Sequence, residues 1–266
     1  MTTAAPLATL TALAVDARVF DLGHVLEPEV PRGVAHVPFL YQQTKRHGDV
    51  VYDDGLSASC DMFVTGVHVG THIDGLAHIS QDGLLHGGVE PSPGPEHGSG
   101  LGIENVAPIV KRAVVLDLPA LLGVDVLEQG HRVSAAEVEA ALHRQDVGIV
   151  PGTAVFFRTG WARDWPALPD VHEAPGPGTE AVGWALDHGG DLFGSDTLAF
   201  EFTPGPGLPV HRQLLVERGI HIMEAVALDE LCAAGVSEFL LVVAPLRLRG
   251  ATGSPVRPLA LVPGPA

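Results

Sequence analysis

The sequence predicts a single α/β domain with a β-rich mixed sheet as its core and helices flanking that sheet. Hydrophobic residues make up 46% of the 266 residues and charged residues only 18%, which is typical of a chain with a buried core. Short Val- and Phe-rich segments cluster in the first half, whereas strand-like and helix-like segments alternate in the second. No repeat or linker divides residues 1–266, so one mixed-sheet domain is expected, with residues 1–15 as a loose N-terminal segment.

The expected strands of the first half are separated by glycines and prolines, of which the chain has 32 and 22. The longest loop signal is His86–Gly102, and loops of this length inside compact domains are usually functional. The expected strands are Arg18–Leu22, Val25–Val30, Ser59–Val69 and Val114–Leu118.

Helices and strands alternate in the second half. The strongest helix signal is Ser134–Gln145, because Ser134 and Glu137 have the spacing of a capping box and an apolar stripe follows them. Pro209–Arg218 is also expected to be a helix, with proline in its first turn and Gly219 just after its end. The remaining expected elements are helices at Thr179–His188 and Leu228–Ala234, and strands at Thr153–Phe157, Leu192–Asp196, Ile220–Met223, Phe239–Leu248 and Pro258–Val262.

Composition excludes several classes of function. The formal net charge is −17 and no cluster of Lys and Arg occurs, so nucleic acid is not an expected partner. No run of about 18 apolar residues is present, so no membrane span is expected. Cys60 and Cys232 are too few for a disulfide framework and are expected to be buried thiols in a reducing compartment. No Lys or Arg precedes Arg18, which argues against a secretory signal, so we expect a cytoplasmic protein.

Residues 68–78 form an eleven-residue run with the pattern H-x-G-T-H-x-D-x-x-x-H. His68, His72, Asp74 and His78 place three imidazoles and one carboxylate in this run, and these groups are the usual ligands of zinc and manganese. Four candidate ligands converge where three or four are required. Gly70 disfavours a helix, so a strand end or tight loop is expected. The run therefore predicts a divalent metal site.

Three protein ligands would leave a position for water, whose pKa falls from about 16 toward about 7 on such an ion. His78 is then free to act as a general acid–base, since its unperturbed pKa is near 6.5. His211 and Glu224 are candidate ligands from the C-terminal half, although each is weak evidence alone. His221 is expected to be structural.

The motif His68-x-Gly70-Thr71-His72-x-Asp74-x-x-x-His78 resembles the signature of the cyclase / kynurenine formamidase-like metal-dependent hydrolases, a family that includes isatin hydrolase. The resemblance extends from about residue 18 to residue 262. Its further landmarks are Asp21-Leu22, Arg158-Thr159-Gly160-Trp161, Pro175-Gly176, Gly194-Ser195-Asp196-Thr197, His211, Gly219-Ile220 and Glu224.

This resemblance implies a fold of the swivelling β/β/α type, a homodimer or homotetramer, and one or two zinc or manganese ions. The positions of His68, His72 and Asp74 would hold one ion. Those of Asp74, His211 and Glu224 would hold a second, with Asp74 bridging. The position of His78 would be the proton shuttle.

Two departures indicate the isatin-hydrolase-like branch. Leu76 occupies the place of a proline that the formamidase form has in its motif, and no tryptophan follows Pro31.

The expected function is metal-dependent hydrolysis of an amide or lactam, such as an isatin-like compound or an N-formyl aryl amine. A metal-dependent lactonase or a lyase/cyclase on the same site is an alternative, and so is a non-catalytic metal-binding protein. No G-x-S-x-G elbow supports a serine hydrolase. The expected partner is a small carbonyl compound.

Overall fold

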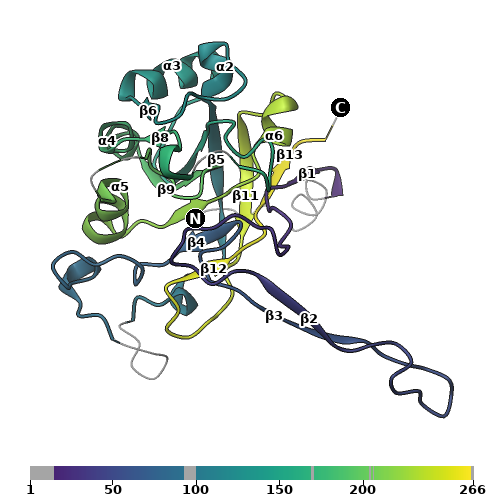
Figure 1. The fold of residues 1–266 in the computed structure, drawn as a ribbon. Helices are drawn as coiled ribbons and strands as arrows, with labels where there is room; N and C mark the ends of the chain where they lie inside the picture. Colours follow the sequence, from purple (N-terminus) through teal and green to yellow (C-terminus); the bar gives the residue numbers. More distant parts are fainter. Residues whose placement is uncertain (1–14, 93–99, 169–170, 204, 206, 265–266) are drawn as a thin grey trace, which may run out of the picture.

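A curled sheet of nine strands forms the core of the computed structural model, which describes residues 15–92, 100–168, 171–203, 205 and 207–264 (Figure 1). The strands are β1 (Arg18–Asp21), β4 (His72–Asp74), β5 (Ile109–Asp117), β7 (Thr153–Arg158), β9 (Gly190–Ser195), β10 (Ile222–Glu224), β11 (Glu238–Val243), β12 (Gly253–Pro255) and β13 (Leu259–Val262). Their order is β1-β13-β11-β5-β7-β9-β10-β4-β12. The central strands β5, β7, β9 and β10 run parallel, and the outer pairings are antiparallel. The expected α/β class with a mixed sheet is confirmed.

The remaining elements are short. The helices are α2 (Leu118–Leu122), α3 (Ala135–Gln145), α4 (Thr179–Asp187), α5 (Pro209–His211), which continues as the π-helix η5 (Arg212–Arg218), and α6 (Asp229–Ala233). Single 3₁₀ turns lie at η1 (His86–Gly88), η3 (Ile103–Asn105) and η4 (Val171–Glu173). Two small sheets pair β2 (Leu40–Lys45) with β3 (Cys60–Val64) and β6 (Arg132–Val133) with β8 (Gly176–Pro177). In the described part of the chain, no helix is both long and apolar enough to cross a membrane.

The central strands are buried on both faces, which explains their nearly continuous apolar sequence. Val114 and Phe157 belong to a core cluster that they share with residues of α3 and α4. Val115 and Phe156, one residue away on the same strands, belong to a second cluster that includes residues of β11. Successive side chains of a strand point to opposite faces, so each central strand supplies both cores.

Helix α3 begins as its sequence predicts. The backbone N–H of Glu137 donates to Ser134 Oγ at 3.3 Å, and the backbone N–H of Ser134 donates to Glu137 Oε2 at 2.8 Å. This reciprocal pair is the predicted capping box, and it satisfies two donors at the helix N-terminus.

Several expected boundaries are wrong. Val25–Val30 is not a strand, because a turn closed by the Val30 N–H on the Glu27 carbonyl interrupts it. The strand expected to reach Leu248 ends at Val243, two residues before Pro245, which lacks the N–H that a ladder needs. The expected loop His86–Gly102 includes residues 93–99, and the N-terminal segment includes residues 1–14; these lie outside the described residues. Cys60 is exposed rather than buried, because β3 pairs with β2 alone in a projecting hairpin.

Candidate metal centre

The second half of the histidine motif forms β4, which lies between β10 and β12. His72 and Asp74 are two residues apart on this strand and therefore point to the same face. Glu224 on β10 pairs directly with His72, so the sheet itself brings the predicted carboxylate to the motif. Ile73 points to the opposite face and is fully buried in the core. The expectation of a strand end rather than a helix is confirmed.

The residues before β4 turn sharply at Gly70. This residue has φ +68°, a left-handed conformation that favours glycine, and a Cβ atom there would collide with the side chain of Leu26. The turn returns the chain so that His68 lies against the same face as Asp74, with His68 Nδ1 2.7 Å from Asp74 Oδ1. The spacing of the motif is therefore set by a turn that feeds a strand.

Five of the predicted residues meet in one buried cluster. His72 Nε2 lies 3.5 Å from Asp74 Oδ1 and 3.3 Å from Glu224 Oε2. His211, at the end of α5, places Nε2 3.1 Å from Glu224 Oε1 and 3.6 Å from Asp74 Oδ2. The exposed fractions of these four residues are 5% or less, and His68 is 9% exposed. The structure thus brings the motif together with both residues proposed from the C-terminal half.

The outer ring nitrogens hold the imidazoles in defined orientations. His72 Nδ1 donates to the carbonyl oxygen of Gly70 at 2.8 Å, and His211 Nδ1 donates to Glu201 Oε1 at 2.7 Å. The Gly70 carbonyl can only accept, and Glu201 Oε1 also accepts the backbone N–H of His211, so each Nδ1 is the donor. The lone pair of each neutral ring then lies on Nε2, facing the carboxylates. Such outer contacts are typical of histidines that bind metals.

A divalent cation fits the donor set of this cluster. His72 Nε2, Asp74 Oδ2 and Glu224 Oε1 are buried and have no hydrogen-bond partner. Nitrogen and carboxylate oxygen atoms that face one another in this way repel unless protons or a cation lie between them. Two groups of atoms lie within 4.8 Å of one another and could hold an ion, one from His68, Asp74 and His78 and the other from His72, Asp74 and Glu224. Asp74 belongs to both groups, and His211 contacts Asp74 and Glu224 of the second group. Which residues bind an ion stays a prediction.

Without a cation, protons on the imidazoles would balance the charge of the buried carboxylates, and the pKa values show this. Burial alone would lower the pKa of His72, but the carboxylates of Asp74 and Glu224 raise it to about 10. Burial likewise opposes the charge of His211, and Glu201 and Glu224 raise its pKa to about 10. Burial would raise the pKa of Asp74, but the neighbouring imidazoles of His68 and His72 hold it well below its usual value. The buried cluster therefore stabilises positive charge on its imidazoles.

His78 lies at the edge of the cluster and is more accessible. Its ring stacks on the ring of His68 with a centroid separation of 3.8 Å and lies 6.2 Å from the ring of His211. Burial lowers the pKa of His78 to about 4, although the carboxylate of Asp74 opposes this. The imidazole is therefore neutral at pH 7, and it is a weaker base than the unperturbed value of 6.5 suggests.

Three residues of the site had no signal in the sequence. Glu201 is 1% exposed and accepts the backbone N–H groups of Val210 and His211 as well as His211 Nδ1. Thr252 Oγ1 lies 2.8 Å from His68 Nε2. A Cβ on Gly253 would lie 2.6 Å from His68 Cε1, so the ring packs directly on the backbone of β12. Glu201, Thr252 and Gly253 lie far from the motif in sequence, so only the three-dimensional arrangement of the chain reveals that they contact it.

The other positions named from the sequence lie outside the cluster and hold the neighbouring segments in place through hydrogen bonds. Asp196 accepts hydrogen bonds from the backbone N–H groups of Thr159 and Gly160, which joins the ends of β7 and β9. The backbone N–H groups of Ala225 and Val226 then donate to the carbonyls of Thr197 and Ser195, which fixes the segment after Glu224. His221 lies outside the cluster, with Nδ1 2.8 Å from the backbone oxygen of Asp74.

Comparison with known proteins agrees with this fold and this motif. Residues 20–202, more than half of the chain, match the Cyclase family, described as "Putative cyclase". The chain belongs to this family, and the resemblance seen in the motif is confirmed.

Solved and curated relatives extend the similarity over nearly the whole chain. An isatin hydrolase of Roseibium aggregatum is 27% identical over 273 aligned residues, which cover 94% of each chain. The crystal structure of a novel cyclase is 27% identical, with a TM-score of 0.84 over 96% of this chain and 91% of that one. Isatin hydrolase A from Ralstonia solanacearum is 25% identical, with a TM-score of 0.76 over 98% of this chain and 99% of that one.

Proposed function

We propose that this protein is a metal-dependent hydrolase that opens the amide bond of a small carbonyl compound, and that an isatin-like lactam is its substrate class. The observation that carries the proposal is the convergence of His72 Nε2, Asp74 Oδ2 and Glu224 Oε1, three buried atoms without hydrogen-bond partners. The similarity to two isatin hydrolases supports the lactam over other carbonyl compounds.

His68, His72, Asp74, His211 and Glu224 would hold the ion or ions. A divalent cation bound there would polarise a carbonyl group and lower the pKa of water toward about 7. The protein keeps these donors in place through the sheet pairing of β4 with β10 and through the outer bonds of the imidazoles. Zn²⁺ and Mn²⁺ both accept imidazole and carboxylate ligands, so both suit this donor set.

His78 is the residue that would move the proton. It is neutral at pH 7, because burial lowers its pKa to about 4, and it can therefore accept a proton from water. The protonated ring, with a pKa of about 4, would be acidic enough to return the proton to the leaving nitrogen. Its stacking on His68 holds the ring beside the cluster.

The test begins with protein from which metal has been removed by a chelator. Such protein should not hydrolyse isatin or N-formyl anilines, and Mn²⁺ or Zn²⁺ should restore the reaction in proportion to the metal bound. Product formed in ¹⁸O-labelled water should carry the label, because hydrolysis adds a water oxygen to the carbonyl carbon. Metal-restored turnover without label would indicate a lyase. Turnover of lactones but not lactams would indicate the lactonase alternative. Metal binding without any turnover would indicate a binding protein.

A further inference from the structure

The strand that carries Glu224 ends directly after that residue, at a strained turn. Ala225 is fully buried and has φ +49°, a left-handed conformation that alanine rarely adopts. In the part of the chain that the structure describes, four residues other than glycine have a positive φ, and two of them are aspartates, which tolerate it better. The other two are Ala225 and Phe200, and Phe200 directly precedes Glu201. Both unusual turns therefore border a carboxylate of the buried site.

Two hydrogen bonds hold Ala225 in this conformation. Its backbone N–H donates to the carbonyl oxygen of Thr197 at 2.9 Å. Its carbonyl oxygen accepts the hydroxyl of Thr71 at 2.6 Å, and the oxygen of that hydroxyl accepts the backbone N–H of His24 at 2.9 Å. Thr71 is 3% exposed, so water does not compete for these bonds. Strained backbone persists only where its surroundings hold it, and here the motif threonine supplies one of the two contacts.

The hydroxyl of Thr71 lies where the ladder between β4 and β10 would otherwise continue. The last pair of this antiparallel register is His72 with Glu224, so the next pair would be Thr71 with Ala225. The left-handed turn ends β10 before that pair forms, and the side chain of Thr71 then reaches the carbonyl oxygen of Ala225. The sheet therefore stops at the pair whose side chains face each other, with His72 Nε2 3.3 Å from Glu224 Oε2.

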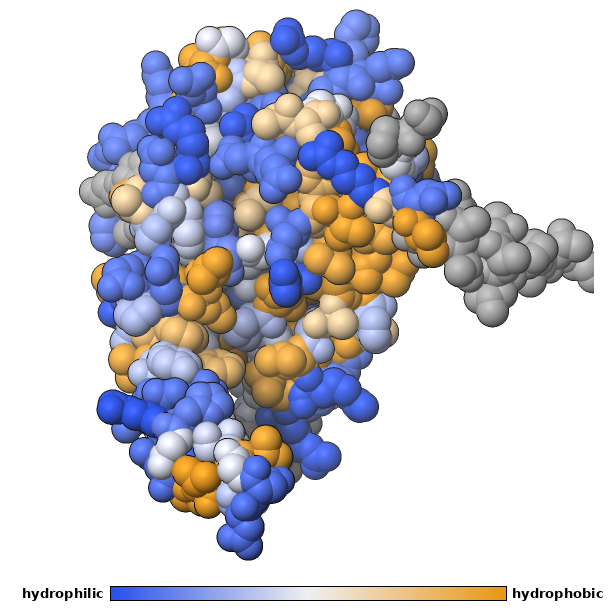
Figure 2. Space-filling model, turned by 90° about the vertical axis from the view of Figure 1, so that its right-hand side faces the viewer, coloured by the Kyte–Doolittle hydropathy of each residue, from blue (hydrophilic) through white to orange (hydrophobic). Residues whose placement is uncertain are grey.

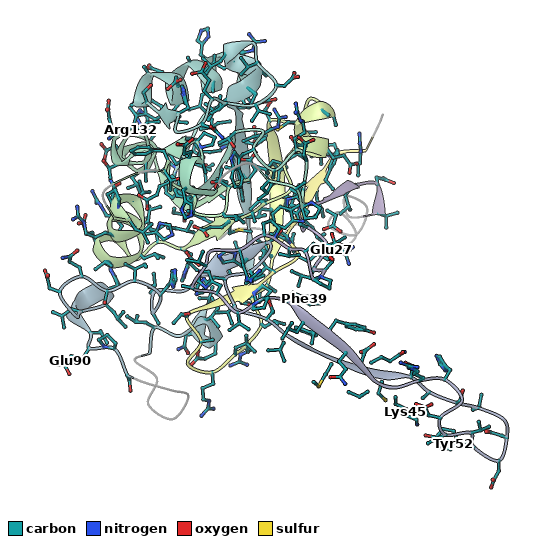
Figure 3. The ribbon with its side chains drawn as sticks, in the orientation of Figure 1. Glu27, Phe39, Lys45, Tyr52, Glu90 and Arg132 are labelled. Carbon is teal, nitrogen blue, oxygen red and sulfur yellow. The ribbon has the colours of Figure 1, made fainter. Side chains whose placement is uncertain are left out.

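The segment that follows β1 closes this junction from the outer side. The backbone N–H of Ala227 donates to the carbonyl oxygen of Leu22 at 2.9 Å, and His24 donates to Thr71, so the segment contacts both sides of the turn. Figure 3 shows Glu27 farther along, in the loop that continues from this edge of the sheet. Figure 2 shows the side of the molecule on which β1 and β13 lie, with apolar side chains gathered there. Leu22 is fully buried, so water is excluded from this side of the turn as well.

We propose that Thr71 is a positioning residue for metal binding, because its hydroxyl holds Ala225 in the turn that fixes the carboxylate of Glu224 opposite His72. This inference rests on the proposed binding of a divalent cation by the cluster. The hydroxyl is occupied by two backbone groups, so Thr71 acts through Ala225 rather than on the cation. If Ala225 relaxed to an extended conformation, the peptide group after Glu224 would reorient and the carboxylate would lose its fixed position.

The test is the affinity of chelator-treated protein for Zn²⁺, measured by calorimetric titration. Thr71→Val removes the hydroxyl at nearly constant volume and should weaken binding about 10–100-fold, the usual loss when a contact that orients a ligand is removed. Thr71→Ser keeps the hydroxyl and should bind nearly as tightly as the natural protein. Thr153→Val is the matched control, because the fully buried Thr153 hydroxyl also accepts two hydrogen bonds, from the Val150 N–H at 3.1 Å and from Arg112 at 3.0 Å, outside the cluster. This control should keep its metal affinity.

Changes at Ala225 separate the positioning role from a general loss of packing. Glycine adopts the left-handed conformation without strain, so the turn of Ala225→Gly depends less on the hydroxyl. Thr71→Val should therefore cost much less metal affinity in the Ala225→Gly protein than in the natural one. Ala225→Val keeps Thr71 but opposes the turn, because a β-branched residue strongly disfavours a positive φ, and it should bind Zn²⁺ more weakly than Ala225→Gly does. Circular dichroism shows whether each variant is folded.

Three results would overturn the proposal. The first is Zn²⁺ affinity in Thr71→Val equal to that of the natural protein. The second is an equal loss from Thr71→Val with alanine and with glycine at position 225, because the hydroxyl would then not act through the turn. The third is equal affinity of Ala225→Val and Ala225→Gly, and this comparison decides alone if Thr71→Val does not fold.

The same titrations distinguish this proposal from the proposed function. A natural protein that binds no Zn²⁺ would contradict both. Zn²⁺ binding that follows the expected order of the variants, without hydrolysis of any amide, would support the role of Thr71 and contradict the proposed function alone. Hydrolysis that depends on metal, with unchanged affinity in Thr71→Val, would contradict only the role of Thr71.

Discussion

Thr252 Oγ1 lies 2.8 Å from His68 Nε2, although 184 residues of chain separate the two. The contact occupies the outer nitrogen of the ring, and His68 Nδ1 then faces Asp74 at 2.7 Å. Thr252, the residue directly before β12, therefore orients the first histidine of the motif. The orientation of His68 therefore depends on a segment near the C-terminus that supplies none of the predicted metal ligands.

Replacement of Thr252 should weaken metal binding without unfolding the protein. Thr252→Val keeps the side-chain volume but removes the hydroxyl that holds His68, and loss of such an outer contact typically costs about 10–100-fold in metal affinity. Thr252→Ser keeps the hydroxyl and should restore most of the affinity. Calorimetric titration with Zn²⁺ measures both. Equal affinities for the Val variant and the natural protein would show that this contact does not position His68.

Replacement of Glu201 should act on His211 in the same way. Glu201→Gln removes the negative charge next to His211 Nδ1 and offers an amide N–H₂ where a carboxylate oxygen accepts a backbone N–H. We expect about 10–100-fold weaker metal binding. Glu217→Gln is the control, since Glu217 is half exposed and pairs with Arg212 on the surface. If both variants lost metal affinity equally, the loss would come from the change in net charge and not from the contact of Glu201 with His211.

The stability of the metal-free protein should depend on pH in a defined direction. The pKa values of His72 and His211 are about 10 in the folded chain, against about 6.5 for an unperturbed imidazole. Between these values the folded protein binds more protons than the unfolded one, so its free energy of unfolding falls as the pH rises from about 6.5 to about 10. Urea unfolding in the presence of a chelator measures this decline. His72→Gln should show a shallower decline, and a natural protein whose stability rises over this range would refute the charge assignment.

His78 should affect stability in the opposite sense. Its pKa is about 4 in the folded chain, so between about 4 and about 6.5 the unfolded chain binds the additional proton. This contribution is fully present above about 6.5 and is lost as the pH falls through about 4. The free energy of unfolding of His78→Ala should therefore fall less steeply on acidification than that of the natural protein. Parallel curves would exclude the buried, neutral state of this ring.

Removal of His78 should also separate proton transfer from metal binding. His78→Ala should keep its metal and lose about 10²–10⁴-fold in turnover, the usual contribution of general acid–base catalysis. Metal content and hydrolysis are measured on the same sample. His143→Ala is the control, because His143 is an exposed residue of α3. Loss of the metal together with turnover would make His78 a ligand, as its place in one of the two candidate groups allows.

The sequence predicted those parts of the fold whose signals are local. Helix α3 was found because Ser134 and Glu137 satisfy each other, and β7 because both of its faces are buried. Strand β2 has no clear signal in the sequence, because it contains Gln42, Gln43 and Thr44 and neither of its faces is covered, so neither an apolar run nor a clear alternation marks it. Its partner β3 lies within the expected strand Ser59–Val69.

The residues of the site also differ in whether a local sequence signal marks them. His68, His72 and Asp74 lie in one short motif, and the turn at Gly70 with the strand after it suffices to bring them together. His211 and Glu224 lie far from the motif in sequence, and only the resemblance to a family links them to it. Glu201 and Thr252 have no motif, because their partners are chosen by the packing of α5 and by the pairing of β12 with β4.

The most direct test of the account is the diffraction of crystals of active protein, recorded on both sides of the manganese and zinc absorption edges. We predict an anomalous peak bounded by His72 Nε2, the carboxylate of Asp74 and Glu224 Oε1. Crystals of fully active protein without a peak among these atoms, or with the metal bound elsewhere, would contradict it.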